Sequence, residues 1–266
     1  MIVYIATPVK QEELYIREWL SHNKSIGVDK IILADNNDSD YHTPLQPIIQ
    51  DFIDEGFVTL LDYRDQKLIQ IPFYNEVYSK YQSQFDWMGF IDADEFIDLP
   101  GFNNIHDFLA TITHQSVSLR WYNYSDNDRL TYEDKPVRTR FPNLSPKQLV
   151  AFQPSKYFMR PGITQPITHP FYPPTLDVCD ALNNLDFKAF VRSPRLFYMM
   201  SHNPEYLRTA FISHYPTKTV EEYIEYKVKR GTVFTAKQKR YTRDFFFTYN
   251  NYSKEKAARL SAPCKF

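Results

Sequence analysis

Over the first 121 residues, short apolar runs typical of strands alternate with longer segments in which apolar residues recur at the spacing of a helix. Short apolar runs of β type fall at 2–6, 30–34, 57–61, 87–91 and 116–121. Apolar residues spaced three and four apart predict amphipathic helices over 12–26, 45–53, 72–81 and 105–112. Alternation of strands and helices is typical of an α/β domain with a mostly parallel sheet.

The periodic pattern weakens after residue 121. Residues 134–216 hold most of the 18 prolines, so we expect irregular structure and short strands there. A helix is predicted from about Val220 to Gly231, which ends it. We therefore predict one compact domain with an α/β half over 1–125 and an irregular, partly helical half over 126–266.

Composition excludes several classes of protein. The chain has 43% hydrophobic residues and a formal net charge of −1, so nothing indicates a nucleic-acid partner. Two cysteines, Cys179 and Cys264, are too few for a disulfide framework and fit a reducing, cytoplasmic setting. The N-terminus looks like a strand and not a signal peptide. No stretch approaches the roughly 20 apolar residues of a membrane span.

Carboxylates follow the apolar run 87–91 directly. In an extended segment Asp92 and Asp94 would point to the same side, where two oxygen ligands suit Mg²⁺ or Mn²⁺. Glu95 would then point to the opposite side, and Asp98 is expected in a loop. A solvated acidic turn without a ligand is the alternative, and it stays open at this point.

A second polar segment, 34–40, follows the apolar run 30–34, and both polar segments would project from the same sheet edge. Asp35 could accept hydrogen bonds from a ribose or a base, although it could equally cap its own turn. No G-x-G-x-x-G and no P-loop motif occurs, so a dinucleotide dehydrogenase or a P-loop enzyme is not expected.

These segments resemble the GT-A glycosyltransferases, most of all the family-2-like and family-92-like (DUF23-type) branch. The matching blocks are EEL-x₃-EWL-x₆-GVDKIILADNND-x-D, Q-x₃-YNEVY, DWMGFIDADEFIDL, LRWYNY, SKYFMRP, ITHP and ISHYPTKTVEEYIEYKVKRG. The resemblance implies a GT-A, Rossmann-like fold whose first half binds the nucleotide sugar. It also implies transfer of a sugar, helped by Mn²⁺ or Mg²⁺, from a nucleotide diphosphate donor, with a UDP-sugar favoured.

The resemblance also implies site residues. The positions that match the nucleotide site are Thr7, Pro8, Val9, Asp35, Asp92 and Lys218. The positions that match the metal site are Asp92, Asp94 and His214. A neutral histidine is a good Mn²⁺ ligand, although a hydrogen-bonded structural histidine is the alternative for His214, and His169 is a weaker competitor for its role.

An inverting transfer needs a carboxylate that deprotonates the acceptor hydroxyl. The candidates are Glu95, Asp126, Asp128 and Glu133, with Asp126 favoured because it follows the LRWYNY strand. The expected acceptor is a glycan or a lipid-linked glycan, in bacterial surface polysaccharide or lipopolysaccharide synthesis.

The expected location is the cytoplasm. The basic segments 237–241 and 253–260 could touch the inner face of the membrane, although a solvated helix face is the favoured explanation. Two rival functions are a metal-dependent nucleotidyltransferase, which the absence of a glycine after the first strand disfavours, and a non-enzymatic carbohydrate-binding protein.

Overall fold

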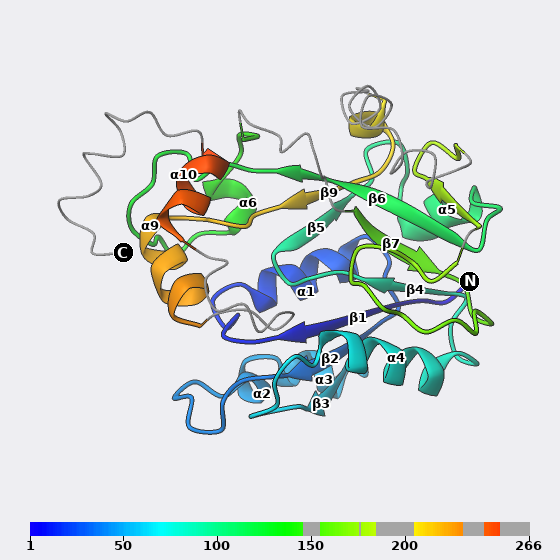
Figure 1. The fold of residues 1–266 in the computed structure, drawn as a ribbon, viewed down its shortest axis with the longest axis horizontal. Helices are drawn as coiled ribbons and strands as arrows, with labels where there is room; N and C mark the ends of the chain where they lie inside the picture. Colours follow the sequence, from blue (N-terminus) through cyan, green and yellow to red (C-terminus); the bar gives the residue numbers. More distant parts are fainter. Residues whose placement is uncertain (146–154, 176, 185–204, 231–241, 251–266) are drawn as a thin grey trace.

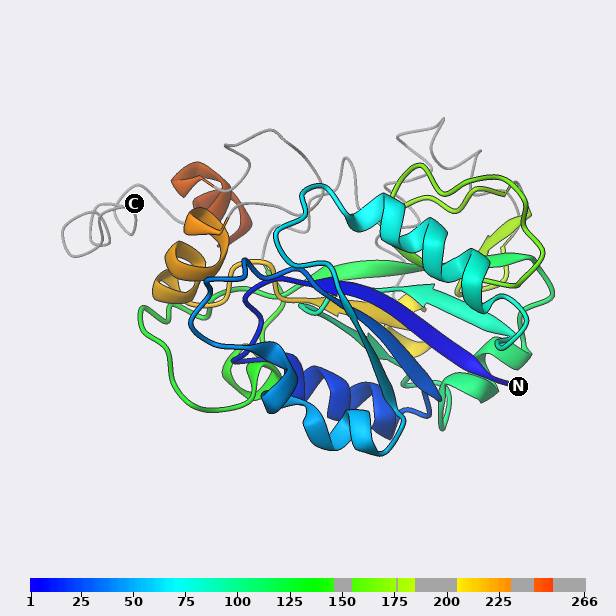
Figure 2. The same cartoon turned by 90° about the horizontal axis from the view of Figure 1, so that it is seen from below.

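The computed structural model describes residues 1–145, 155–175, 177–184, 205–230 and 242–250. A nine-stranded sheet forms the centre of this described part, and strands from both predicted halves of the chain lie in it. Helices cover both faces of the sheet (Figures 1 and 2). The predicted α/β class with a mostly parallel sheet is therefore confirmed. The basic segments 237–241 and 253–260, and Cys264, lie outside the described residues.

Four parallel strands form one half of the sheet in the order β3-β2-β1-β4. These strands are β1 (Val3–Val9), β2 (Lys30–Asp35), β3 (Val58–Asp62) and β4 (Trp87–Phe90). The chain winds outward from β1 to β3 and then crosses to the other side of β1. That reversal creates a switch point between β1 and β4, and open α/β sheets bind ligands beyond the carboxyl ends of their strands at such points.

The other strands continue from β4 in the order β7-β6-β9-β5, with β8 beside β6. Their bounds are β5 (Glu95–Asp98), β6 (Ser116–Asn123), β7 (Ser155–Met159), β8 (Val178–Asp180) and β9 (Phe211–His214). Strand β7 is antiparallel to both β4 and β6. Strand β9 runs parallel to β6 on one side and antiparallel to β5 on the other.

The longer helices belong to the first half of the chain. The helices are α1 (Ile16–Ser25), α2 (Leu45–Ile48), α3 (Gln50–Asp54), α4 (Gln70–Tyr81), α5 (Ile105–Ala110), α6 (Val137–Arg140), the 3₁₀ turn η1 (Tyr206–Arg208), α9 (Val220–Tyr223), the π-helix η2 (Ile224–Lys229) and α10 (Arg243–Asn250). No helix in the described ranges is long and apolar enough to cross a membrane.

Two hydrophobic cores lie on opposite faces of the sheet. Helices α1, α2 and α3 cover one face and α4 covers the other (Figure 2). Trp19 of α1 belongs to the first core, and Phe73 and Val77 of α4 belong to the second. The central strands are thus buried on both faces. This explains why their sequences are continuous apolar runs and do not alternate between apolar and polar residues.

Three expected boundaries differ in the structure. Thr7, Pro8 and Val9, which follow the apolar run 2–6 expected as the first strand, are the last residues of β1. A strand, β5, begins at Glu95 where we expected none, because this segment pairs with the distant strand β9. The helix expected over 45–53 is divided at Ile49 into α2 and α3.

The close contact between β4 and β7 gives a testable prediction. A Cβ atom added to Gly89 would lie only 2.7 Å from Cζ of Phe158, a fully buried ring on β7. We expect Gly89→Ala to lower the free energy of unfolding by about 1–3 kcal/mol, as overpacking does. Urea denaturation of Gly89→Ala, Phe158→Leu and the double variant measures this. The double variant should recover part of the loss, and strictly additive effects would contradict the contact.

Candidate active site

The register of three strands assembles a polar cluster at the end of the sheet. His214 is the last residue of β9, which lies between β6 and β5. It is paired with Asn123 of β6 on one side and with Glu95 of β5 on the other. The backbone of Asp94 continues the ladder, since its carbonyl accepts a 2.9 Å hydrogen bond from the amide of Tyr215. Backbone pairing therefore brings together residues that are 119 positions apart in the case of Glu95 and His214.

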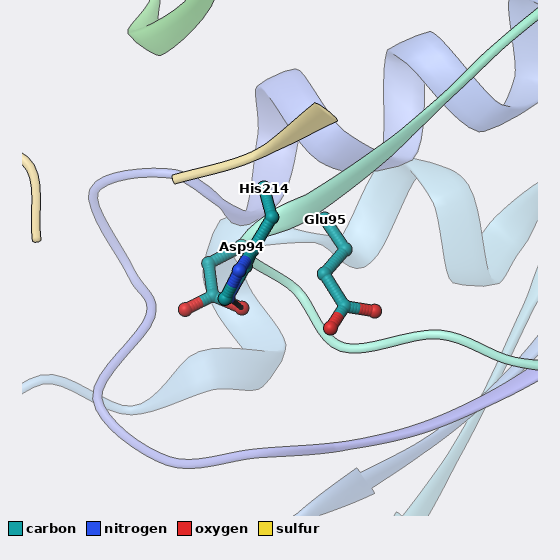
Figure 3. Close-up of side chains that lie close together, drawn as sticks. All are labelled: Asp94, Glu95 and His214. Atoms are coloured by element: carbon teal, nitrogen blue, oxygen red, sulfur yellow. Dashed lines mark ion pairs between the residues drawn. The ribbon is translucent and has the colours of Figure 1, made fainter. Parts of the chain in front are cut away.

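The side chains of Asp94, Glu95 and His214 form a buried group with metal-binding chemistry. One potential ligand atom from each lies within 4.8 Å of the others. Figure 3 shows the three side chains extending in the same direction from the β9 end and the β5 start. Two carboxylates and an imidazole are a donor set that suits Mn²⁺. We call these three residues the acid–histidine group.

The acid–histidine group differs from the pair expected from D-x-D. The segment from Asp92 to Glu95 is a turn and not an extended strand, with the amide of Glu95 donating to the carbonyl of Asp92 at 3.1 Å. The turn aims Glu95 toward Asp94, so the expectation that these two side chains point to opposite sides is wrong. Asp92 lies outside the group and instead accepts a 2.9 Å hydrogen bond from Gln70.

Three buried lysines surround these carboxylates. Lys156 of β7 is fully buried, with Nζ 2.7 Å from Asp92 and 3.6 Å from Glu95. Lys227 of η2 lies 2.5 Å from Asp94 Oδ2. Burying charges is expensive unless each has a partner, so these pairs are what makes the acidic cluster compatible with the fold.

Lys218 is the exception among the three lysines. It is 5% exposed, and its ammonium lies 4.1 Å from the ring centroid of Tyr15. Within the described part of the chain no carboxylate lies within ion-pair distance of it. Burial lowers the pKa of Lys218. Its backbone has φ 53, a left-handed conformation that a lysine rarely adopts. A buried ammonium without a carboxylate partner is a position suited to an anionic ligand.

Asn123 and Trp121 fix the orientation of His214. Nδ1 of His214 lies 2.8 Å from Oδ1 of Asn123, which can only accept, so Nδ1 carries the proton. Burial lowers the pKa of His214 to about 3, and the ring is therefore neutral near pH 7. Nε2 is then an unprotonated ligand atom, and it lies 3.8 Å from Asp94 Oδ1. The Trp121 ring packs against the imidazole at 4.0 Å between centroids.

The two carboxyl groups of the acid–histidine group have opposite protonation tendencies. Burial opposes the charge of Asp94, but the Lys227 ammonium holds the pKa of Asp94 well below its usual range. Burial raises the pKa of Glu95 well above its usual range, despite the attraction of Lys156. Oε1 of Glu95 is also a buried oxygen without a hydrogen-bond donor among the described residues. Such an orphaned oxygen is accounted for if a cation binds there, so the group fits Mn²⁺ or Mg²⁺.

Asp35, one of the residues predicted to contact the nucleotide, lies at the edge of a cavity. It ends β2 and lines a cavity of about 950 Å³ with Leu45, Leu61 and Arg64. Oδ1 of Asp35 accepts from the amide of Asn37 at 3.0 Å, so it also caps its own turn. Burial raises the pKa of Asp35.

Thr7 links β1 to the segment that precedes the Asp92 turn. Its hydroxyl, which is fully buried, donates to the carbonyl of Ile91 and so ties the end of β1 to the residue before Asp92. Pro8 and Val9 form the rest of the β1 end, next to Asp35 in the register.

The structure separates the candidates for the base. Glu95 belongs to the acid–histidine group, whereas Glu133 forms ion pairs with Arg129 and Lys135. Asp126 is 2% exposed, and its backbone amide donates to Asn250 of α10 at 2.8 Å. The amide of Asp128 donates to Asp126 at 3.3 Å.

His169 lies outside the acid–histidine group. Its Nδ1 accepts from the amide of Phe171 at 3.2 Å.

Sequence reasoning missed Lys156, Lys227 and Asn123. Lys156 stands in the SKYFM run, where every residue is buried, so a charged residue in an apolar strand was the available signal. Lys227 and Asn123 stand inside the matched blocks YKVKRG and LRWYNY, but nothing local in those blocks indicates that either contacts the DADE turn.

The acid–histidine group follows β4, beside the switch point at which open α/β sheets bind their ligands. The model of glycosyltransferase family 92 matches residues 4–257. The chain belongs to glycosyltransferase family 92, which confirms the family resemblance seen in the sequence.

Family 92 proteins from plants are among the similar sequences. One from Ricinus communis is 27% identical over 103 residues, and one from Oryza sativa subsp. japonica is 25% identical over 117 residues. These matches cover 39% and 40% of this chain, and each spans only 18% of the relative's own length.

Two solved structures overlap with part of the fold. The S. aureus TarS fragment 1–349 in complex with UDP-GlcNAc has a TM-score of 0.41 at 12% identity, covering 60% of this chain and 45% of that one. The mannosyltransferase PcManGT from Pyrobaculum calidifontis in complex with GDP-Man and Mn²⁺ has a TM-score of 0.34 at 16% identity, covering 44% and 34%.

The Asn123 contact predicts one tautomer of His214. Nitrogen-15 NMR of the wild-type imidazole should show the Nδ1–H form. Asn123→Leu removes the acceptor from a buried donor, so we expect a loss of about 1–3 kcal/mol in the free energy of unfolding and a mixed tautomer signal. An Nε2–H signal in the wild-type protein would contradict the arrangement.

Proposed function

We propose that this protein is a divalent-cation-dependent glycosyltransferase that moves a sugar from a nucleoside diphosphate donor, with UDP favoured as the nucleotide, to a glycan or lipid-linked glycan acceptor. Membership of family 92 supports the reaction class. The observation that carries the proposal is the acid–histidine group, which lies just beyond β4 and therefore beside the switch point of the sheet.

The acid–histidine group would hold the cation through Asp94, Glu95 and the Nε2 atom of His214. A divalent cation bound there would supply positive charge against the leaving diphosphate. Asn123 keeps Nε2 available, and the backbone ladder between β9 and β5 fixes the spacing between the imidazole and the carboxylates. Side chains that are already in place when the ligand arrives make charge stabilisation more effective.

Lys218 would bind a phosphate oxygen, because its buried ammonium has no carboxylate partner in the described structure and a diphosphate supplies the missing negative charge. Asp35 would accept hydrogen bonds from the ribose or the base, since it ends β2 and lines a cavity whose other lining residues come from α2, α3, β3 and their flanks. The end of β1 lies between the Asp35 and Asp92 turns, so the nucleotide would extend across Thr7–Val9.

The acceptor half of the reaction requires a base that deprotonates the acceptor hydroxyl. Asp126 is the favoured base for an inverting transfer, since it lies shortly after Asn123, the last residue of β6. An acceptor from bacterial surface polysaccharide synthesis fits the same proposal.

Isothermal titration with UDP tests the proposed donor site. The wild-type protein should bind UDP at least tenfold more tightly with Mn²⁺ than with EDTA, because the cation and the diphosphate neutralise each other. Asp94→Asn should remove this metal dependence while leaving Lys227 with a hydrogen-bond acceptor. Asp107→Asn, an exposed change on α5, serves as the control and should behave as the wild type. Equal UDP affinity with and without Mn²⁺ in the wild type would refute cation dependence.

A further inference from the structure

The two oxygens of Asp94 face two different groups. Oδ1 lies 3.8 Å from Nε2 of His214, and Oδ2 lies 2.5 Å from Nζ of Lys227. All three side chains are at least nine-tenths buried. The Asp94 carboxylate is thus shared between the proposed cation position and the Lys227 ammonium. The bound cation and the ammonium would both be positively charged.

The position of Lys227 is set by a rigid support. Helix α9 begins with a capping box in which Thr219 and Glu222 bond reciprocally. The Glu222 carboxylate also accepts two hydrogen bonds from Arg140, at 2.8 and 2.9 Å. The π-helix η2 continues directly from α9 and carries Lys227 to Asp94. Single π-helical turns inside helices are frequent at functional sites.

A cation and an ammonium on the same buried carboxylate repel each other, because low-dielectric surroundings strengthen the interaction between charges. Lys227 therefore opposes cation binding while no anion is present. A diphosphate removes the opposition, since its negative charge attracts both positive groups. A lysine that shares Asp94 with the cation can also donate to a phosphate oxygen beside it.

We propose that Lys227 couples the two ligands of the site: it weakens binding of the cation alone and contributes to binding of the diphosphate once the cation is present. This inference rests on the proposed function. Linkage requires the coupling to be reciprocal, so the same residue should increase the effect of UDP on Mn²⁺ affinity and the effect of Mn²⁺ on UDP affinity.

The test measures free Mn²⁺ by electron paramagnetic resonance in protein titrations, with and without UDP. Lys227→Met removes the charge and keeps an unbranched side chain that is one atom shorter. We expect it to bind Mn²⁺ alone about tenfold more tightly than the wild type, and to bind UDP about tenfold more weakly at saturating Mn²⁺. Lys229→Met is the matched control, because Lys229 belongs to the same helix but forms an exposed pair with Glu225.

Lys227→Arg keeps the positive charge and should restore UDP affinity toward the wild-type value. Unchanged or weaker Mn²⁺ binding in Lys227→Met, or unchanged UDP binding, would overturn the role of Lys227. If this variant fails to fold, wild-type crystals decide: Nζ should contact Asp94 without ligands and a UDP phosphate with Mn²⁺ and UDP. Nζ away from the phosphate in the latter crystals would overturn the proposal.

The measurements on the wild-type protein distinguish failure of this inference from failure of the proposed function. A wild-type protein whose UDP binding ignores Mn²⁺ refutes the cation-dependent site, and the coupling role is refuted with it. A wild-type protein that binds the two ligands cooperatively, and a Lys227→Met variant with the same cooperativity, refute only the role of Lys227.

Discussion

Compensation of buried charge is the constraint on which the candidate site depends. Asp94 and Glu95 are buried at the start of β5, and Lys156, Lys218 and Lys227 are buried around them. Removing ions from water costs several kcal/mol each unless partners replace the solvent. The lysines provide that replacement for the carboxylates, but among the described residues Lys218 has no carboxylate partner and the Oε1 atom of Glu95 has no hydrogen-bond donor. This charge balance is compatible with the proposed pair of ligands, a divalent cation and a diphosphate.

The sheet supplies the rigidity that this balance needs. Each group around Asp94 comes from a different element, with His214 on β9, Lys156 on β7 and Lys227 on η2. Backbone ladders set the strand positions, and the Arg140–Glu222 pair anchors the helix that leads to η2. The backbone positions of these charged side chains are therefore set before a ligand binds. Charged and polar groups that are in place in advance stabilise a developing charge without reorganising, which is the physical basis of preorganised catalysis.

The sequence predicts local features of this protein well and non-local ones poorly. Apolar periodicity located the strands β1 to β4 and β6, because burial on both faces leaves a direct pattern in the chain. The D-x-D motif also identified Asp92 and Asp94 as candidates, and the family resemblance added His214. Neither could show that Glu95 begins a strand paired with β9, or that Lys156 and Lys227 approach the same turn. Those contacts join segments more than 60 residues apart, and no local propensity encodes them.

The central claim is that Asp94, Glu95 and His214 bind the cation that holds the donor diphosphate. An anomalous difference map from a crystal soaked with Mn²⁺ and UDP tests it most directly, with data collected on both sides of the manganese absorption edge. The account predicts one manganese peak about 2.0–2.3 Å from carboxylate oxygens of Asp94 and Glu95 and from His214 Nε2, in contact with the UDP diphosphate. Bound UDP with its diphosphate on the lysines and no manganese peak at these residues would contradict it.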